Sequence, residues 1–125
     1  MQRTDLIVLA VDDDLINLKL LKSLLMKSGH VKEVVEAKNG SDAIGVLKQR
    51  DDIDLILLDI IMPIMNGIEM LKVVRADDTL RQLPIIVLTT DETKKNEALE
   101  SGANGFLMKP IRNDDLLKKM ATVIL

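Results

Sequence analysis

The sequence DLILLDIIMPIMNG, residues 54–67, contains a short apolar run that ends at an acidic residue. Leu55–Leu58 consists only of leucine and isoleucine, which is typical of a parallel strand covered by helices on both faces. Asp59 ends the run, and a loop with Pro63 and Gly67 follows it. The stretch therefore predicts a buried strand that carries a carboxylate at its carboxyl end.

The rest of the chain repeats this arrangement of apolar runs followed by amphipathic segments. Further strands are predicted at Leu6–Val11, Val31–Glu36, Ile85–Leu88 and Gly105–Met108. Helices are predicted at Leu15–Lys27, Ser41–Gln49, Gly67–Arg75, Thr93–Glu100 and Asp114–Ile124. The alternation indicates an α/β fold, (βα)5, with a doubly wound five-stranded parallel sheet and helices on both faces. We expect one domain over residues 1–125, with the polar strand Val31–Glu36 at an edge of the sheet.

Composition excludes several classes of function. The 125 residues suffice for one domain with a hydrophobic core, and the absence of cysteine excludes disulfides and cysteine-ligated zinc. The net charge of -3 and the single aromatic residue argue against direct nucleic acid binding, which needs a basic face or stacking platforms. No apolar run is long enough to span a membrane, and the N-terminus does not resemble a signal peptide. We therefore expect a cytoplasmic protein without a membrane partner.

Polar residues stand at the carboxyl ends of four predicted strands. They are Asp12 and Asp13 after the first strand, Asp59 after the third, Thr89 after the fourth and Lys109 after the fifth. The carboxyl ends of parallel strands meet at one edge of a sheet, so these side chains are expected to share one pocket. Three carboxylates, a hydroxyl and an ammonium group suit a divalent cation beside a phosphoryl group.

Each of these residues has a more ordinary explanation when it is considered alone. A single aspartate after a strand is usually a turn residue or a helix cap, and we assign the capping role to Asp14. A lone threonine is usually a cap, and a lone lysine is usually solvated. The joint occurrence at four strand ends favours a site instead. A carboxylate such as Asp59 can attack phosphorus and form an acyl phosphate, and a cation bound by the clustered carboxylates would offset their charge.

Four motifs resemble those of the response-regulator receiver domain of two-component signal transduction, in the same order and spacing. They are Val11–Asp13, Leu57–Gly67, Leu88–Thr90 and Gly102–Pro110. The resemblance extends over essentially the whole chain. It implies a CheY-like domain with the flavodoxin-like strand order 2-1-3-4-5, and a cis peptide bond between Lys109 and Pro110.

The resemblance also implies how phosphorylation takes place. Asp59 would accept a phosphoryl group from a histidine kinase or a histidine phosphotransfer protein. Mg²⁺, or Mn²⁺ as a substitute, would be held by Asp13, Asp59 and the backbone carbonyl of Ile61, with Asp12 assisting through water. Such a domain is not an enzyme with an external substrate, because it catalyses only its own phosphoryl transfer and dephosphorylation.

The signal that follows is likewise implied by the resemblance. Lys109 and Thr89 would contact the phosphoryl group, and Thr89 would move toward it. Phe106 takes the position of an aromatic residue that then swings inward. The output face would be the fourth helix, the fifth strand and the fifth helix. Phenylalanine has no hydroxyl group, so packing rather than hydrogen bonding would transmit the change.

Two further hypotheses concern the surroundings of the site. At 100° per residue, the first predicted helix has a broad core-facing side made of Leu18, Leu20, Leu21, Leu24 and Leu25. It leaves three apolar residues exposed as a docking surface for the phosphodonor, namely Leu15, Ile16 and Met26. Self-dephosphorylation is expected to be slow to moderate, because Ile61 cannot hydrogen-bond an attacking water and Thr90 narrows access. Asp91 is then the remaining nearby group that can orient water.

Two other protein classes share parts of this pattern. A phosphatase of the haloacid-dehalogenase type needs a second aspartate two residues after the nucleophile, where this chain has Ile61. A flavodoxin-like binding module needs a phosphate-binding loop after the first strand, where Asp12–Asp14 would repel a phosphate.

The sequence leaves open the cognate kinase, the downstream effector and whether the protein is a monomer or a phosphorylation-dependent dimer. It is also consistent with a stand-alone regulator, a relay intermediate or a domain of a longer protein.

Overall fold

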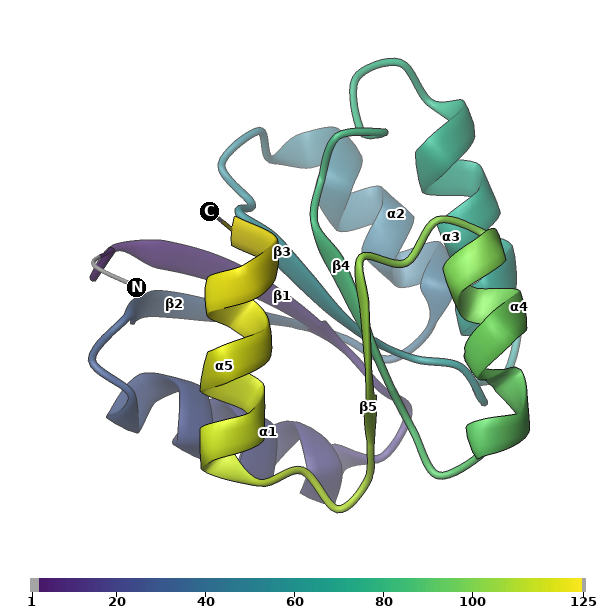
Figure 1. Ribbon diagram of the computed structural model, residues 1–125. Coiled ribbons are helices and arrows are strands. Elements are labelled where there is room, and N and C mark those ends of the chain that lie inside the picture. Colours follow the sequence, from purple (N-terminus) through teal and green to yellow (C-terminus); the bar gives the residue numbers. More distant parts are fainter. Residues whose placement is uncertain (1–2, 125) are drawn as a thin grey trace.

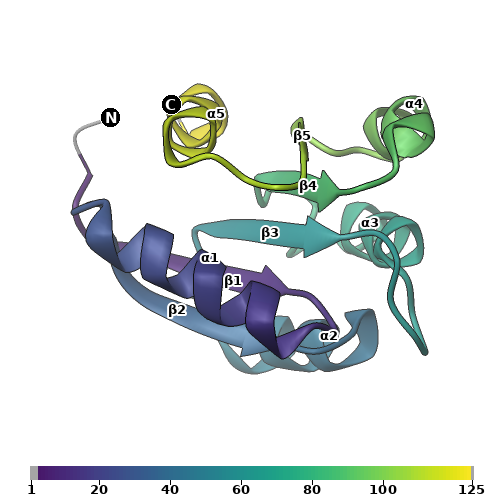
Figure 2. The same cartoon turned by 90° about the horizontal axis from the view of Figure 1, so that it is seen from below.

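The computed structural model describes residues 3–124, and within this range the strands form one parallel sheet. Its strands are β1 (Leu6–Val11), β2 (Val31–Ala37), β3 (Leu55–Asp59), β4 (Ile85–Thr89) and β5 (Gly105–Met108). Figure 2 shows them in the order β2-β1-β3-β4-β5. The predicted fold class, the strand order and the edge position of the second strand are confirmed.

The helices follow the strands as predicted, with small differences at their ends. They are α1 (Leu15–Lys27), α2 (Gly40–Gln49), α3 (Gly67–Ala76), α4 (Lys95–Glu100) and α5 (Asn113–Ile124). The predicted helix Thr93–Glu100 is divided, because the short 3₁₀ helix η1 (Glu92–Lys94) precedes α4. Asp91 caps η1 by accepting the Thr93 N–H at 3.0 Å, which starts the segment with a tight turn. None of the helices between residues 3 and 124 has the length and apolar character that a membrane crossing would require.

Helices cover both faces of the sheet (Figure 1): α1 and α5 lie on one face, and α2, α3 and α4 on the other. Alternate residues of a strand point to opposite faces. In β3, Leu55 and Leu57 accordingly pack with α1 and α5, whereas Ile56 and Leu58 pack with the other three helices. Because both faces are buried, the strand needs a continuous apolar sequence.

The core-facing side of α1 is narrower than the periodicity predicted. Leu18, Leu21 and Leu25 are buried, but Leu20 is 60% exposed and Leu24 is only half-buried. The prediction that Leu20 belongs to the core is therefore wrong. Leu20 instead lines a groove beside the helix, together with Pro110 and Ile111 of the segment after β5.

The ends of the strands are aligned at the carboxyl edge of the sheet. Asp59 in β3 lies opposite Leu88 in β4, and Thr89 lies opposite Met108 in β5. The peptide bond between Lys109 and Pro110 is cis, as the resemblance implied. This alignment places the last residue of each strand, or the residue after it, beside its neighbours.

Candidate functional site

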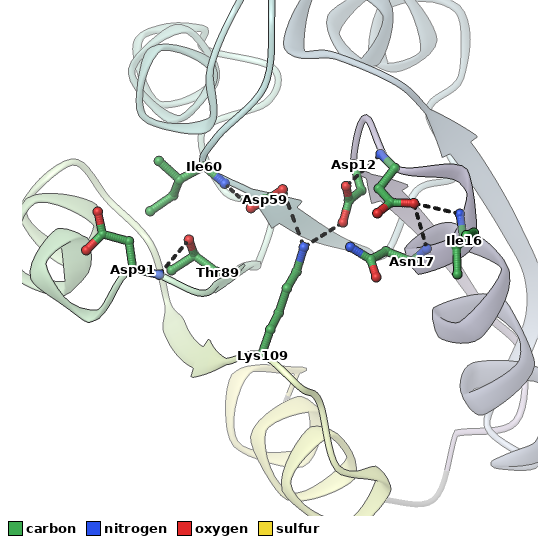
Figure 3. Close-up of polar contacts among 9 residues, drawn as sticks. Asp12, Ile16, Asn17, Asp59, Ile60, Thr89, Asp91 and Lys109 are labelled. Carbon is green, nitrogen blue, oxygen red and sulfur yellow. Dashed lines mark hydrogen bonds and ion pairs between the residues drawn. The ribbon is translucent and has the colours of Figure 1, made fainter.

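Four polar residues from different strands meet at the carboxyl edge of the sheet (Figure 3). Asp12 follows β1, Asp59 ends β3, Thr89 ends β4 and Lys109 follows β5. The Lys109 Nζ lies 2.7 Å from Asp12 Oδ2 and 3.4 Å from Asp59 Oδ2. Since Asp12 and Lys109 are 97 positions apart in the sequence, only the parallel sheet brings them together. The structure thus assembles the residues that the strand ends predicted.

An acidic cluster forms the part of the site next to α1. Carboxylate oxygens of Asp12, Asp13 and Asp59 lie within 4.8 Å of one another. Asp12 and Asp59 are buried, whereas Asp13 is exposed. Oxygen donors at this spacing, without nitrogen or sulfur, fit a hard divalent cation such as Mg²⁺. The carbonyl of Ile61, on the loop after β3, remains a predicted fourth ligand.

Backbone amides fix the orientation of the two buried carboxylates. The Asp14 N–H donates to Asp12 Oδ1 at 2.9 Å, and the Ile60 N–H donates to Asp59 Oδ1 at 2.8 Å. In both side chains the other oxygen, Oδ2, faces Lys109. Asp14 itself caps α1 by accepting the Ile16 N–H at 2.9 Å, which confirms its predicted role.

Burial and charge shift the pKa values in this site. Burial raises the pKa of the Asp59 carboxyl group; the charge of Lys109 opposes this effect, and the charge of Asp12 adds to it. Burial alone would lower the pKa of Lys109. Its hydrogen bond to Asp12 and the charges of both aspartates outweigh burial, so that the pKa of Lys109 is raised. The site therefore combines a lysine that stays charged with an aspartate that ionises less readily than usual.

The affinity of the site for Mg²⁺ is expected to fall as the pH is lowered from neutrality into the acidic range. Because the pKa of Asp59 is raised, its carboxyl group takes up a proton in a range where a free aspartate remains ionised. A protonated carboxyl group binds a cation poorly, so protons and Mg²⁺ compete. Isothermal titration calorimetry at several pH values measures the effect. A constant affinity over this range would contradict the prediction, and an Asp59→Asn variant should show a weaker pH dependence.

The two predicted switch residues lie on adjacent strands. Thr89 is completely buried, and its Oγ1 accepts a hydrogen bond of 3.3 Å from the Asp91 N–H. Phe106 lies opposite Val87 in the pairing of β4 with β5, is half-buried, and packs against the core on the side of α2, α3 and α4. Both residues therefore belong to one strand pair beside the site, while their movement remains a prediction.

A groove of about 350 Å³ opens next to the site, between α1 and the segment after β5. Its apolar wall consists of Leu20, Leu21, Leu24, Leu88, Pro110 and Ile111. Asn17 also lines the groove, and its side chain points toward Asp12 and Lys109 (Figure 3). Asn17 was not among the site residues predicted from the sequence. Its only signal was an amide in a helix otherwise made of leucine, isoleucine, methionine, lysine and serine.

The three residues of the predicted docking surface are exposed as expected. The exposed fractions are 52% for Leu15, 70% for Ile16 and 44% for Met26. Exposure of these apolar side chains is thus confirmed, whereas the binding of a partner remains a prediction.

Comparison with known proteins identifies relatives that share both sequence and fold. Residues 8–121 match the family model of the response regulator receiver domain. The chain is 34% identical to a chemotaxis protein CheY homolog of Campylobacter jejuni, over 94% of this chain and 91% of that protein. The structure of the chemotaxis response regulator CheY4 of Vibrio cholerae matches with a TM-score of 0.86 and 35% identity, over 96% of this chain and 99% of that one.

A second solved structure bears on the acidic cluster. The receiver domain of a sensor histidine kinase from Pseudomonas aeruginosa matches with a TM-score of 0.86 and 26% identity, over 95% of this chain and 97% of that one. In that protein a magnesium ion is coordinated in the active site cleft. In the present structure, the carboxylates of Asp12, Asp13 and Asp59 form the acidic cluster described above.

Proposed function

This chain belongs to the response regulator receiver domain family, and on this basis we propose that Asp59 is the phosphoacceptor of a two-component system or phosphorelay. One observation carries the proposal. Asp59 ends a central strand, with Lys109 Nζ 3.4 Å away and the carboxylates of Asp12 and Asp13 beside it. A nucleophile, a cation for a phosphoryl oxygen and the donors for a divalent cation thus occupy one pocket.

In the proposed reaction, a carboxylate oxygen of Asp59 attacks the phosphorus of a phosphohistidine. An O–P bond forms and the N–P bond breaks; the electron pair of that bond stays on the ring nitrogen, and the donor imidazole, which carries a proton on its other ring nitrogen, leaves as neutral histidine. Lys109 is already positioned to pair with a phosphoryl oxygen, and the Thr89 hydroxyl is the second protein group for that role. Mg²⁺, held by Asp12, Asp13 and Asp59 with the Ile61 carbonyl, would reduce the repulsion between the carboxylate and the incoming group. Mn²⁺ should substitute for it.

The test is to incubate the protein with acetyl phosphate and Mg²⁺ and to record its intact mass over time. A gain equal to one phosphoryl group is expected with Mg²⁺ and not in the presence of EDTA. The chain contains no tryptophan or tyrosine, so mass is a better signal than intrinsic fluorescence. If the protein binds Mg²⁺ but gains no phosphoryl group from acetyl phosphate or from a histidine phosphotransfer protein, the proposal fails.

Phosphorylation of Asp59 would convert the site into a switch. A phosphoryl group adds roughly -1.5 to -2 charges and several strong acceptor oxygens. The Thr89 hydroxyl accepts the Asp91 N–H at 3.3 Å, and a shift of the hydroxyl toward the phosphoryl group would weaken this hydrogen bond and make room behind Thr89. Phe106, half-buried on the next strand, would then turn inward and alter the face of α4, β5 and α5. That face is the proposed contact for a downstream effector, or for a second copy in a phosphorylation-dependent dimer.

The proposed phosphodonor is a histidine kinase or a histidine phosphotransfer protein. Its docking surface would include the exposed residues Leu15, Ile16 and Met26. The groove beside Asn17 offers a second apolar contact for the same donor helix, because it opens directly onto Asp12 and Lys109. A donor that contacts α1 in this way would bring its phosphohistidine close to Asp59.

The phosphorylated protein is expected to lose its phosphoryl group over minutes or longer rather than seconds. The Ile61 side chain offers no hydrogen bond to an attacking water. The Thr93 hydroxyl donates a hydrogen bond to Asp91 Oδ1, and this hydrogen bond lowers the pKa of the Asp91 carboxyl group, which makes Asp91 a weaker base. Intact mass recorded after removal of acetyl phosphate gives the rate. Loss within seconds would contradict the prediction, and an Ile61→Asn variant should lose the group faster.

A further inference from the structure

The short segment of residues 37–40 connects the two sides of the proposed cation site. Ala37 is the last residue of β2, and Gly40 is the first residue of α2. On one side, the Asp12 N–H donates to the Ala37 carbonyl at 3.1 Å. On the other side, the Gly40 N–H donates to the Met65 carbonyl at 3.1 Å. In addition to the direct pairing of β1 with β3, the segment thus links the residue after β1 to the loop after β3 through two hydrogen bonds and three peptide bonds.

The contact between Gly40 and the loop after β3 is unusually close. A Cβ atom added at Gly40 would lie 2.8 Å from Met65 Cγ, 2.9 Å from the Met65 carbonyl oxygen and 3.0 Å from Met65 Cβ. One of these atoms belongs to the backbone and cannot rotate away. The residue before it, Asn39, is buried and caps α2 by accepting the Asp42 N–H at 2.8 Å. The start of α2 is thus fixed in position, and the space at residue 40 admits only a glycine.

The loop that Gly40 contacts is strained. Ile64 has a φ of 69° although it is β-branched, and the Met65 N–H donates to the Pro63 carbonyl at 2.8 Å. These features form a three-residue turn with a left-handed centre, which is rare for such a residue. The Ile64 side chain is 80% exposed, so its packing does not hold the turn. Strained conformations persist when the surrounding structure fixes them, and the Gly40 contact lies directly beside this turn.

We propose that residues 37–40 set the distance between the two sides of the cation site, and that Gly40 is a positioning residue for divalent cation binding. The inference rests on the proposed function, in which Asp12, Asp13 and the loop with the Ile61 carbonyl hold the cation together. Gly40 does not touch the cation. It acts through Met65, whose backbone it fixes relative to the strand end that carries Asp12.

The test compares Mg²⁺ binding by isothermal titration calorimetry in the wild type, a Gly40→Ala variant and a Gly45→Ala variant. Gly45 lies in the same helix, and a Cβ there would meet no atom within 4 Å. Gly40→Ala is expected to bind Mg²⁺ about tenfold more weakly, as is typical when groups that support metal ligands are changed. Gly45→Ala should bind Mg²⁺ like the wild type. Urea unfolding without divalent cations shows that each variant is folded during the titration.

A purely structural role for Gly40 would lower the stability and leave the affinity of the folded protein unchanged. That result would overturn the inference. If Gly40→Ala does not fold, hydrogen exchange of the wild type tests the inference instead. The Gly40 amide is expected to exchange more slowly when Mg²⁺ is bound. An unchanged exchange rate would overturn the inference. A wild type that binds Mg²⁺ but takes up no phosphoryl group would contradict the proposed function alone. If the wild type is phosphorylated but the Gly40→Ala variant binds Mg²⁺ with the same affinity as the wild type, only the role of Gly40 is contradicted.

Discussion

An Asp59→Asn variant is expected to take up no phosphoryl group from acetyl phosphate under conditions in which the wild type is phosphorylated. The amide of asparagine is a poor nucleophile, and the carboxylates of Asp12 and Asp13 are not in a position to replace it. Asp12 is hydrogen-bonded to Lys109 at 2.7 Å, and Asp13 is exposed at the rim of the cluster. Intact mass measurement after incubation with Mg²⁺ gives the result directly.

The same variant is expected to remain folded and to gain stability at neutral pH when no divalent cation is present. Burial raises the pKa of Asp59, so in the folded protein ionisation of this group is less favourable than in the unfolded chain. The ionised carboxylate therefore destabilises the native state above its native pKa, and asparagine removes this cost. The gain in stability should disappear as the pH falls below the pKa that the Asp59 carboxyl group has in the unfolded chain, because the group is then protonated in both the folded and the unfolded state.

The control for this experiment is Asp78→Asn, which changes a carboxylate whose side chain is 93% exposed in the loop after α3. Its phosphorylation should equal that of the wild type. Continued uptake of one phosphoryl group by a folded Asp59→Asn protein would show that another residue is the acceptor. A variant that unfolds would contradict the predicted gain in stability, which urea denaturation measures independently.

A Gly67→Ala substitution is expected to destabilise the protein by about 3 kcal/mol or more. The added Cβ would lie 2.3 Å from the carbonyl oxygen of Asp59 and 2.8 Å from the Cα of Ile60. Both atoms belong to the backbone at the end of β3, and the Gly67 N–H donates to the Ile60 carbonyl at 2.9 Å. The clash can be relieved only by moving α3 away from the strand or by distorting the site. Urea unfolding followed by circular dichroism measures the loss.

Gly45→Ala is the matched control for this change as well. It replaces a glycine in the middle of α2 where the added Cβ meets no neighbour, so the helix should gain about 0.5 to 1 kcal/mol. The two substitutions are chemically identical and differ only in their surroundings. If Gly67→Ala lowers the free energy of unfolding by less than about 1 kcal/mol, the backbone at the end of β3 moves more easily than expected for a closely packed interior.

The sequence by itself determined the class of fold and the members of the central site. Short aliphatic runs such as Leu55–Leu58 are typical of strands with both faces covered, and their regular alternation with amphipathic segments indicates a parallel sheet between helices. The carboxyl ends of parallel strands share one edge, so Asp12, Asp59, Thr89 and Lys109 followed from their positions after those runs. The strand order came from the resemblance to a family rather than from these patterns.

Features that depend on contacts between distant segments were decided only by the tertiary structure. Periodicity assigned Leu20 to the core, but its exposure depends on how α1 lies against the segment that follows β5, about which a local pattern carries no information. Asn17 gained its place beside Lys109 in the same way. The glycines at 40 and 67 look alike in the sequence, yet one meets the side chain and backbone of Met65 and the other the carbonyl of Asp59. Local sequence fixes periodicity and strand ends, whereas close approaches and pKa shifts arise from atoms that only folding brings together.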